Sequence, residues 1–355
     1  MTDTPARWRL PIDGFLATML TAVALALLFP AVGRSDGPLH LGVVTNVGVA
    51  LVFLLHGANL ATDKLVAGMR HWRLHLFVQL CTFALFPVLG LALAWLLEGR
   101  VEPGLMVGLL FLCMLPSTIS SSVAFTAMAG GNVAAAVFNA TLSNLIGIVL
   151  TPLLISQVLH VAGEGLPIGR AILGISVQLL LPFIVGQLLR PHVQGWMVRH
   201  KGLTHRLDRG VIVLIVFCSF SDSAAAGIWS GQGWVMVLQA LLVCAGLLAL
   251  VLSLTRFAAR RVGFRREDEV VAVFCGSKKS IASGIPIARL LFGVRPDLGL
   301  ILLPALLYHQ IQLMACAALA RRYARAFEAE AGAQGQAVAQ PTHERGGNPS
   351  AGGLR

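Results

Sequence analysis

The chain alternates between long apolar stretches and short polar connections. Ten of these stretches approach the ~20 residues that a helix needs to cross the hydrocarbon core of a bilayer. They fall at residues 12–30, 41–60, 74–97, 105–129, 132–158, 168–190, 209–228, 234–256, 269–293 and 298–320. The pattern therefore predicts an all-α integral membrane protein with ten transmembrane helices, in a transmembrane domain that covers residues 12–320.

Polar residues and helix breakers interrupt the fourth and the ninth stretch. The interruptions are Leu-Pro-Ser-Thr at 115–118 and Gly-Ser-Lys-Lys at 276–279. Lipid tolerates irregular backbone only where the backbone is buried in protein or lines a cavity. Each broken stretch is the fourth of five, and an odd number of spans inverts the second half. We therefore predict two inverted five-helix repeats, 12–158 and 168–320, whose broken helices cross near the middle of the membrane.

The basic residues are distributed unevenly between the two sides of this layout. The chain has a net charge of +11, with 12% charged residues, and 18 Lys and Arg fall in connections on one side against 5 on the other. Such a bias marks cytoplasmic loops, so it explains the charge without nucleic-acid binding. Residues 1–11 and 321–355 are then cytoplasmic, and the Ala-, Gly-, Gln- and Glu-rich tail after Arg325 is predicted to be disordered.

Two adjacent lysines, Lys278 and Lys279, stand in the middle of the ninth stretch. A charge at bilayer depth costs at least ~2.5–3.5 kcal/mol, so it usually faces a cavity or a partner and marks function. In a broken helix the second half directs free N–H groups into the break, where they attract anions. The lysines are therefore predicted to bind an anionic substrate, or one of them takes the place of a coupling cation. Asp222 is predicted to neutralise one of them in at least one conformational state.

Other polar residues gather at membrane depth in the third, fourth, fifth, ninth and tenth spans. As further binding residues for a solute or ion we predict Gln79, Ser117, Thr118, Ser121, Ser122, Asn139, Ser143, Asn144, Ser277, Ser280, His309 and Gln310. Hydroxyl and amide side chains also serve helix packing, and His309 could carry protons or make a structural hydrogen bond. The six cysteines lie inside apolar stretches, which predicts packing and not disulfides or a metal site. We expect no cofactor beyond a coupling ion, sodium or proton.

Four motifs and the ten-span layout carry a resemblance to a known family. The motifs are His-Trp-Arg-Leu-His-Leu at 71–76, Ala-Gly-Gly-Asn-Val-Ala-Ala-Ala at 129–136, Phe-Cys-Gly-Ser-Lys-Lys-Ser at 274–280 and His-Gln-Ile-Gln-Leu-Met at 309–314. Over residues 10–325 the chain resembles the SBF-like branch of the bile acid:sodium symporter superfamily. The resemblance implies a panel domain (spans 1, 2, 6 and 7), a core domain (spans 3–5 and 8–10), alternating access between them, and a bacterial inner membrane.

The chain departs from the sodium-binding members of that superfamily at both breaks. Their Pro-Gly-Gly-x-x-Ser-Asn reads Pro-Ser-Thr-Ile-Ser-Ser-Ser at 116–122, so that Ser121 is kept and the asparagine becomes Ser122. Their Glu-x-Gly-x-Gln-Asn reads Phe-Cys-Gly-Ser-Lys-Lys at 274–279, so that a phenylalanine replaces the carboxylate and lysines replace the amides. Gln79, Ser121 and the hydroxyl groups around them are the oxygen ligands that we expect to remain. We therefore expect transport that does not strictly require sodium.

The sequence favours a secondary transporter for a small organic anion, with the solute and the lipid bilayer as its partners. A membrane protein that has lost transport and regulates a partner through its basic loops is the alternative. A channel is less favoured because nothing resembles a selectivity filter. An enzyme is not expected because no nucleophile–base pair or metal motif stands near the lysines. The sequence specifies neither the identity of the solute nor the oligomeric state.

Overall fold

The computed structural model describes residues 14–60, 71–161, 170–231, 233–293 and 295–339, and every regular element within these ranges is helical. Residues 1–11, Lys64, Arg70 and the tail from residue 340 lie outside them. The elements of the first half are α1 (Gly14–Leu28), α2 (Pro30–Gly33), α3 (Leu41–Asn59), α5 (Trp72–Leu80), the π-helix η1 (Cys81–Leu85), α6 (Phe86–Leu96), α7 (Pro103–Met114), α8 (Ser120–Met128) and α9 (Val133–Val161). Those of the second half are α10 (Arg170–Arg199), α11 (Lys201–Ala225), α12 (Gly233–Val262), α13 (Arg266–Gly276), α14 (Ile281–Phe292) and α15 (Leu298–Ala339).

The apolar character of these helices fits a membrane protein. Within the described residues, six helical stretches are long and apolar enough to cross a bilayer: 41–59, 72–96, 133–158, 233–262, 266–292 and 298–327. Two shorter apolar helices cover 17–28 and 103–114. The all-α prediction is thus confirmed for the described residues, while ten spans in two inverted repeats remain a prediction.

Both predicted interruptions are present. The fourth stretch is divided into α7 and α8, and the ninth into α13 and α14. Pro116 has no N–H to continue the ladder of α7. In the ninth stretch α13 ends at Gly276, and α14 begins after Ser280, whose hydroxyl accepts a hydrogen bond from the Ser283 N–H as an N-cap.

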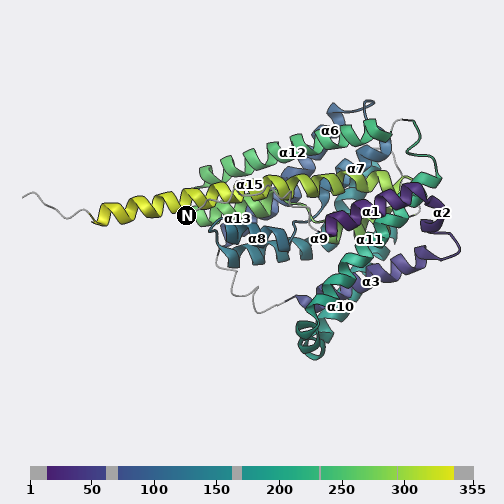
Figure 1. Ribbon diagram of the computed structural model, residues 1–355, viewed down its shortest axis with the longest axis horizontal. Coiled ribbons are helices and arrows are strands. Elements are labelled where there is room, and N and C mark those ends of the chain that lie inside the picture. Colours follow the sequence, from purple (N-terminus) through teal and green to yellow (C-terminus); the bar gives the residue numbers. More distant parts are fainter. Residues whose placement is uncertain (1–13, 61–70, 162–169, 232, 294, 340–355) are drawn as a thin grey trace, which may run out of the picture.

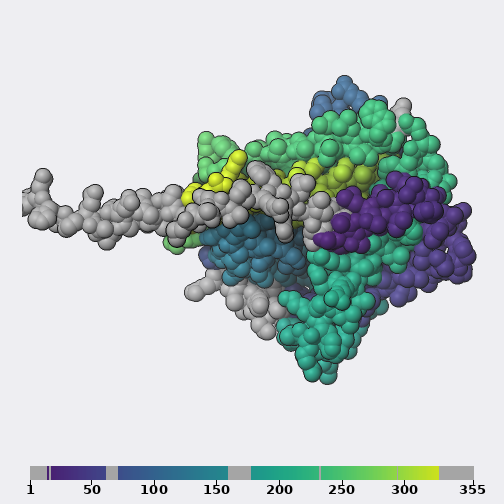
Figure 2. Space-filling model, viewed as in Figure 1, coloured from purple at the N-terminus to yellow at the C-terminus, as the bar shows by residue number. Residues whose placement is uncertain are grey.

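The helices form two groups (Figure 1). In the first, α3 packs along α10 and α1 against α11; in the second, α15 packs against α7 and α12, and α6 against α7. The groups meet through α11, which contacts α14 and α15. There the Ser223 hydroxyl donates to the Pro296 carbonyl and accepts from the Gly299 N–H, at 2.8 and 2.9 Å. The space-filling view shows the segment where α10 passes into α11 projecting from the molecule (Figure 2).

The last helix is longer than predicted. α15 continues to Ala339, so the prediction of disorder after Arg325 is wrong for residues 326–339. Alanine, glutamate and glutamine are strong helix formers, and a helix that is already nucleated adds each further residue at little cost. Figure 1 shows this part of α15 extending beyond the other helices.

Candidate functional site

The two helix breaks lie directly against each other. The Ser280 N–H donates to the Pro116 carbonyl at 2.8 Å, and the Ser117 hydroxyl donates to the Cys275 carbonyl at 2.7 Å. Gly284 makes this approach possible, because a Cβ there would lie 2.7 Å from a side-chain carbon of Leu115. Polar groups freed in one break are thus satisfied by the other.

Lys279 extends from the ninth-stretch break into a set of backbone carbonyls. Its ammonium donates to the carbonyl oxygens of Thr82, Cys113 and Leu115, at 3.0, 2.8 and 2.7 Å. The Phe86 ring lies 3.9 Å from Nζ, and the residue is 1% exposed. Three acceptors require three N–H donors, which only the protonated amine has. This geometry suits a protonated Lys279.

The Thr82 carbonyl is free because of the π-helix that contains it. In η1 the Phe86 N–H bonds to the Cys81 carbonyl, five residues back. The next bond in this register would join residue 87 to Thr82, but residue 87 is a proline and has no N–H. One proline thus leaves the Thr82 carbonyl without a donor from its own helix at residue 87.

The other two acceptors belong to the end of α7. The last carbonyls of a helix have no partner within it. The Met114 carbonyl accepts from the Thr151 hydroxyl of α9 at 2.8 Å, and the carbonyls of Cys113 and Leu115 accept from Lys279. One ammonium therefore joins the third stretch to the fourth-stretch break.

The backbone of Lys279 is held separately, by Gln312 of α15. The Lys279 N–H donates to Gln312 Oε1 and the Lys279 carbonyl accepts from Gln312 Nε2, both at 3.0 Å. The Tyr308 hydroxyl donates to the Ser277 carbonyl at 2.8 Å. His309 Nδ1 lies 3.0 Å from Gln312 Nε2. His309 is thus part of the hydrogen-bonded support of the break.

Lys278 has a different environment. It is 0% exposed, and its Nζ has no hydrogen-bond acceptor among the described residues. Nζ lies 3.9 Å from the centre of the Phe125 ring on α8 and 5.6 Å from that of Phe274. Phe274, which stands in place of a carboxylate, thus provides an aromatic face, and the hydrogen-bonding capacity of the ammonium is unused.

Side chains of α9 line the same breaks. Asn144 Nδ2 donates to the Ser117 carbonyl at 2.7 Å, and its Oδ1 accepts from the Ser283 hydroxyl. The Ser143 hydroxyl accepts from the Ser117 N–H at 3.0 Å. Asn139 donates to the Ala135 carbonyl of its own helix at 3.0 Å. Ser143 and Asn144 therefore fix the fourth-stretch break.

The remaining predicted residues differ in their hydrogen bonds and in their burial. Gln79 donates to the Asn139 carbonyl at 3.2 Å, and Ser122 lies 3.4 Å from the Phe274 carbonyl. Thr118 is buried near the start of α8, and Gln310 lies half-buried on α15. Three of the predicted site residues carry a buried oxygen that has no hydrogen-bond partner among the described residues: Gln79 Oε1, Asn139 Oδ1 and Ser121 Oγ.

The pairing predicted for Asp222 is not found in this conformation. Its carboxylate accepts from the N–H and the hydroxyl of Ser35, at 2.9 and 2.6 Å. Asp222 therefore anchors the connection between α2 and α3 to α11. In this conformation the carboxylate has two donors and Lys279 has three acceptors elsewhere, so a pairing in another conformational state stays a prediction.

Sequence reasoning missed the residues that satisfy Lys279, because backbone carbonyls carry no residue-type signal. Pro87 was the available sign, since a proline within an apolar helix leaves an earlier carbonyl without its donor. Tyr308 and Gln312 were also missed as supports of the break. Both lie on the buried side of α15, one turn apart.

The electrostatic balance of the site is positive. Lys278 and Lys279 are both buried, and Glu269 is the one buried carboxylate among the described residues, at the far end of α13. Three carbonyl dipoles offset the charge of Lys279, whereas Lys278 has only aromatic faces. The site is therefore suited to an anion.

Comparison with known proteins identifies the chain. Residues 13–325 match the model of the SBF-like CPA transporter family. The chain is 46% identical to "Putative symporter YfeH" of Escherichia coli (strain K12) over 317 residues, 89% of this chain and 94% of that protein. It is 47% identical over 313 residues to "Uncharacterized protein PA2026" of Pseudomonas aeruginosa, 88% and 93% of the two chains. It is 30% identical over 305 residues to "Sodium/bile acid cotransporter 7" of Mus musculus, 85% and 89% of the two chains. The chain therefore belongs to the SBF-like CPA transporter family.

Proposed function

We propose that this protein is a secondary transporter for a small organic anion, and that the Lys279 ammonium takes the place of a coupling cation. The observation that carries the proposal is the position of Nζ among three backbone carbonyls, at 2.7–3.0 Å, where the two breaks meet. Such a cage of carbonyl oxygens suits a monovalent cation. In this protein the cation is covalently attached.

In this proposal Lys278 is the counter-charge of the solute. Its ammonium is held beside the break with no acceptor among the described residues, and the half-buried Phe125 ring of α8 lies over it. Movement of the first helix group, which contains α1, α3, α10 and α11, relative to the second group would open this position to each side in turn. Membership in a transporter family supports transport over the alternative of a regulator.

The orientation follows from the charge distribution. We propose that both termini face the cytoplasm of a bacterial inner membrane, because basic residues concentrate on that side of the predicted layout. The end that carries the α12–α13 connection is then cytoplasmic, and the end that carries the α2–α3 connection faces outward.

Counterflow into proteoliposomes tests the proposed function. Vesicles loaded with an unlabelled solute and diluted into the labelled one report exchange whatever the coupling ion. We expect at least one small carboxylate to exchange, in choline buffer as well as in sodium buffer. Exchange limited to neutral or cationic solutes would contradict the predicted substrate class. Anion exchange that stops when choline replaces sodium would contradict the proposed coupling.

A further inference from the structure

A basic pocket lies away from the helix breaks, where α12, α13 and α15 come together. Its volume is about 440 Å³, within the range of small-molecule sites. The charged side chains that line it are Arg256, Arg260, Arg266, Arg322 and Glu269. Four guanidinium groups against one carboxylate give the pocket a surplus of three positive charges.

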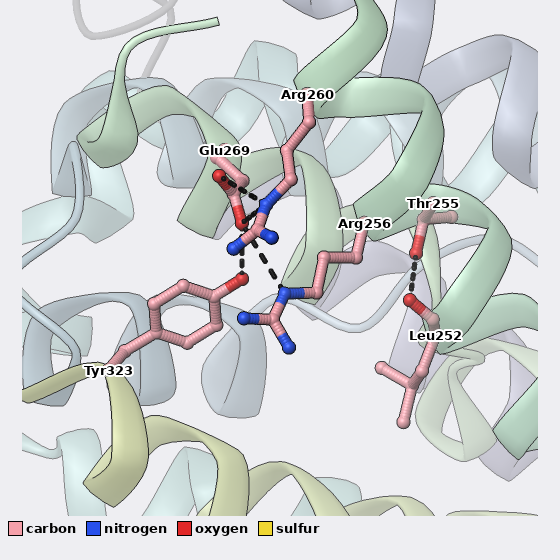
Figure 3. A network of polar contacts seen from close by, with 6 residues as sticks. All are labelled: Leu252, Thr255, Arg256, Arg260, Glu269 and Tyr323. Carbon is pink, nitrogen blue, oxygen red and sulfur yellow. Dashed lines mark hydrogen bonds and ion pairs between the residues drawn. The ribbon is translucent and has the colours of Figure 1, made fainter. Parts of the chain in front are cut away.

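Glu269 holds two of these arginines in place. Its carboxylate accepts from Arg260 Nε at 3.1 and 3.3 Å, forms an ion pair with Arg256 Nε at 3.7 Å, and accepts from the Tyr323 hydroxyl at 2.7 Å. Figure 3 shows Glu269 between these groups, with the terminal nitrogens of Arg256 directed away from it. Both contacts use Nε, so the outer nitrogens can bind a second anion without loss of the first.

In the predicted layout the pocket lies at the cytoplasmic surface of the membrane, at the depth of a lipid headgroup. Its lining residues on α12 and α15 fall within six residues of the ends of the predicted spans 234–256 and 298–320, and Arg266 and Glu269 belong to the first turn of α13. Phe264 and Leu319 add apolar wall beside the arginines. A basic, partly apolar pocket between membrane helices suits an anionic lipid headgroup.

We propose that this pocket binds a phosphate-bearing anion, and that its source is the headgroup of an anionic phospholipid. Guanidinium groups bind phosphate oxygens in pairs of parallel hydrogen bonds, and their fixed orientation lowers the entropy lost on binding. The pocket connects α12, α13 and α15, and α13 leads directly to Lys278 and Lys279. A bound lipid would therefore stabilise the helix that positions the lysine pair.

Thermal unfolding in detergent micelles tests this proposal. The test variant is Arg266→Gln with Arg322→Gln, which removes two lining charges and leaves Arg256, Arg260 and Tyr323 in contact with Glu269. The matched control is Arg321→Gln with Arg325→Gln, which removes two exposed charges of α15 that do not line the pocket. Phosphatidylglycerol, phosphatidylcholine and soluble glycerol phosphate are titrated separately, and the ligand-induced rise in Tm is recorded.

We expect phosphatidylglycerol to raise Tm saturably in the wild type and the control. For the test variant, the lipid concentration that gives half of the rise in Tm should be about tenfold higher. Phosphatidylcholine should have no such effect. If glycerol phosphate alone reproduces the effect and its loss, the phosphate site stands and its source is in solution, which overturns the lipid assignment. Equal stabilisation of both double variants, or of the wild type by both lipids, would overturn the proposal entirely.

Discussion

Replacement of Lys279 by methionine is expected to lower the Tm of the purified protein by on the order of 5–10 °C. The substitution removes three hydrogen bonds from a charged donor, each worth ~1.5–3 kcal/mol, and leaves the carbonyls of Thr82, Cys113 and Leu115 unpaired in a dry interior. The free energy recovered by no longer burying an ammonium reduces this loss. It does not cancel the loss, because backbone carbonyls cannot be replaced by apolar groups. A net loss near 3 kcal/mol corresponds to a fall in Tm of this order.

The adjacent lysine provides the control for this measurement. Lys278→Met makes the same chemical change one residue earlier, where no carbonyl in the part of the chain that the structure describes accepts a hydrogen bond from the ammonium. Differential scanning fluorimetry of both variants in one detergent should show a large fall in Tm for Lys279→Met alone. Equal falls would mean that the three carbonyl contacts contribute nothing specific to stability.

Lys278→Met is expected to leave Tm unchanged or higher and to reduce anion exchange about ten- to hundredfold. Burial of an ammonium without hydrogen bonds costs several kcal/mol, whereas the aromatic contacts to Phe125 and Phe274 return ~2 kcal/mol. Removal of the charge therefore does not destabilise the fold. A charge-assisted hydrogen bond to the solute is worth ~1.5–3 kcal/mol, which converts to the stated factor.

Counterflow of the identified solute, together with the Tm of the same preparation, measures this effect. The combination separates solute binding from folding, because a purely structural residue would change both quantities. Full exchange by a stable Lys278→Met protein would show that the solute's counter-charge lies elsewhere.

The sequence was sufficient to predict where the helices break. Pro116 and Gly276 each stand beside a run of polar residues within an apolar stretch, and the structure interrupts both stretches there. The lysine pair also identified the site, because two charges in one apolar stretch need a local explanation. These signals are local, and each is readable in a window of about ten residues.

The different environments of the two lysines were not predictable in the same way. The first acceptor of Lys279, the Thr82 carbonyl, is 197 residues away and is free only because Pro87 follows a π-turn. The partner of Asp222 is Ser35, a residue in the short connection between α2 and α3 that no sequence pattern marks as a partner. The helix beyond Arg325 was missed because its composition suits both a disordered tail and a solvated helix. Long-range pairing and freed backbone groups leave little trace in residue types.

In the proposed function the Lys279 ammonium replaces a coupling cation, because a sodium ion beside it would be repelled. At an effective dielectric constant of ~20, two unit charges ~4 Å apart repel by about 4 kcal/mol. That energy corresponds to a loss of roughly a thousandfold in sodium affinity. Phe274 has no carboxylate to offset a second positive charge, and the Asp222 carboxylate is hydrogen-bonded to Ser35.

Equilibrium binding of radioactive sodium to the purified protein, measured by scintillation proximity, tests this claim most directly because it needs no knowledge of the solute. The wild-type protein is predicted to show no saturable sodium binding, and unlabelled sodium should displace no more label than choline does. Saturable binding that unlabelled sodium displaces and choline does not would contradict the account, since a sodium site would then exist beside the Lys279 ammonium.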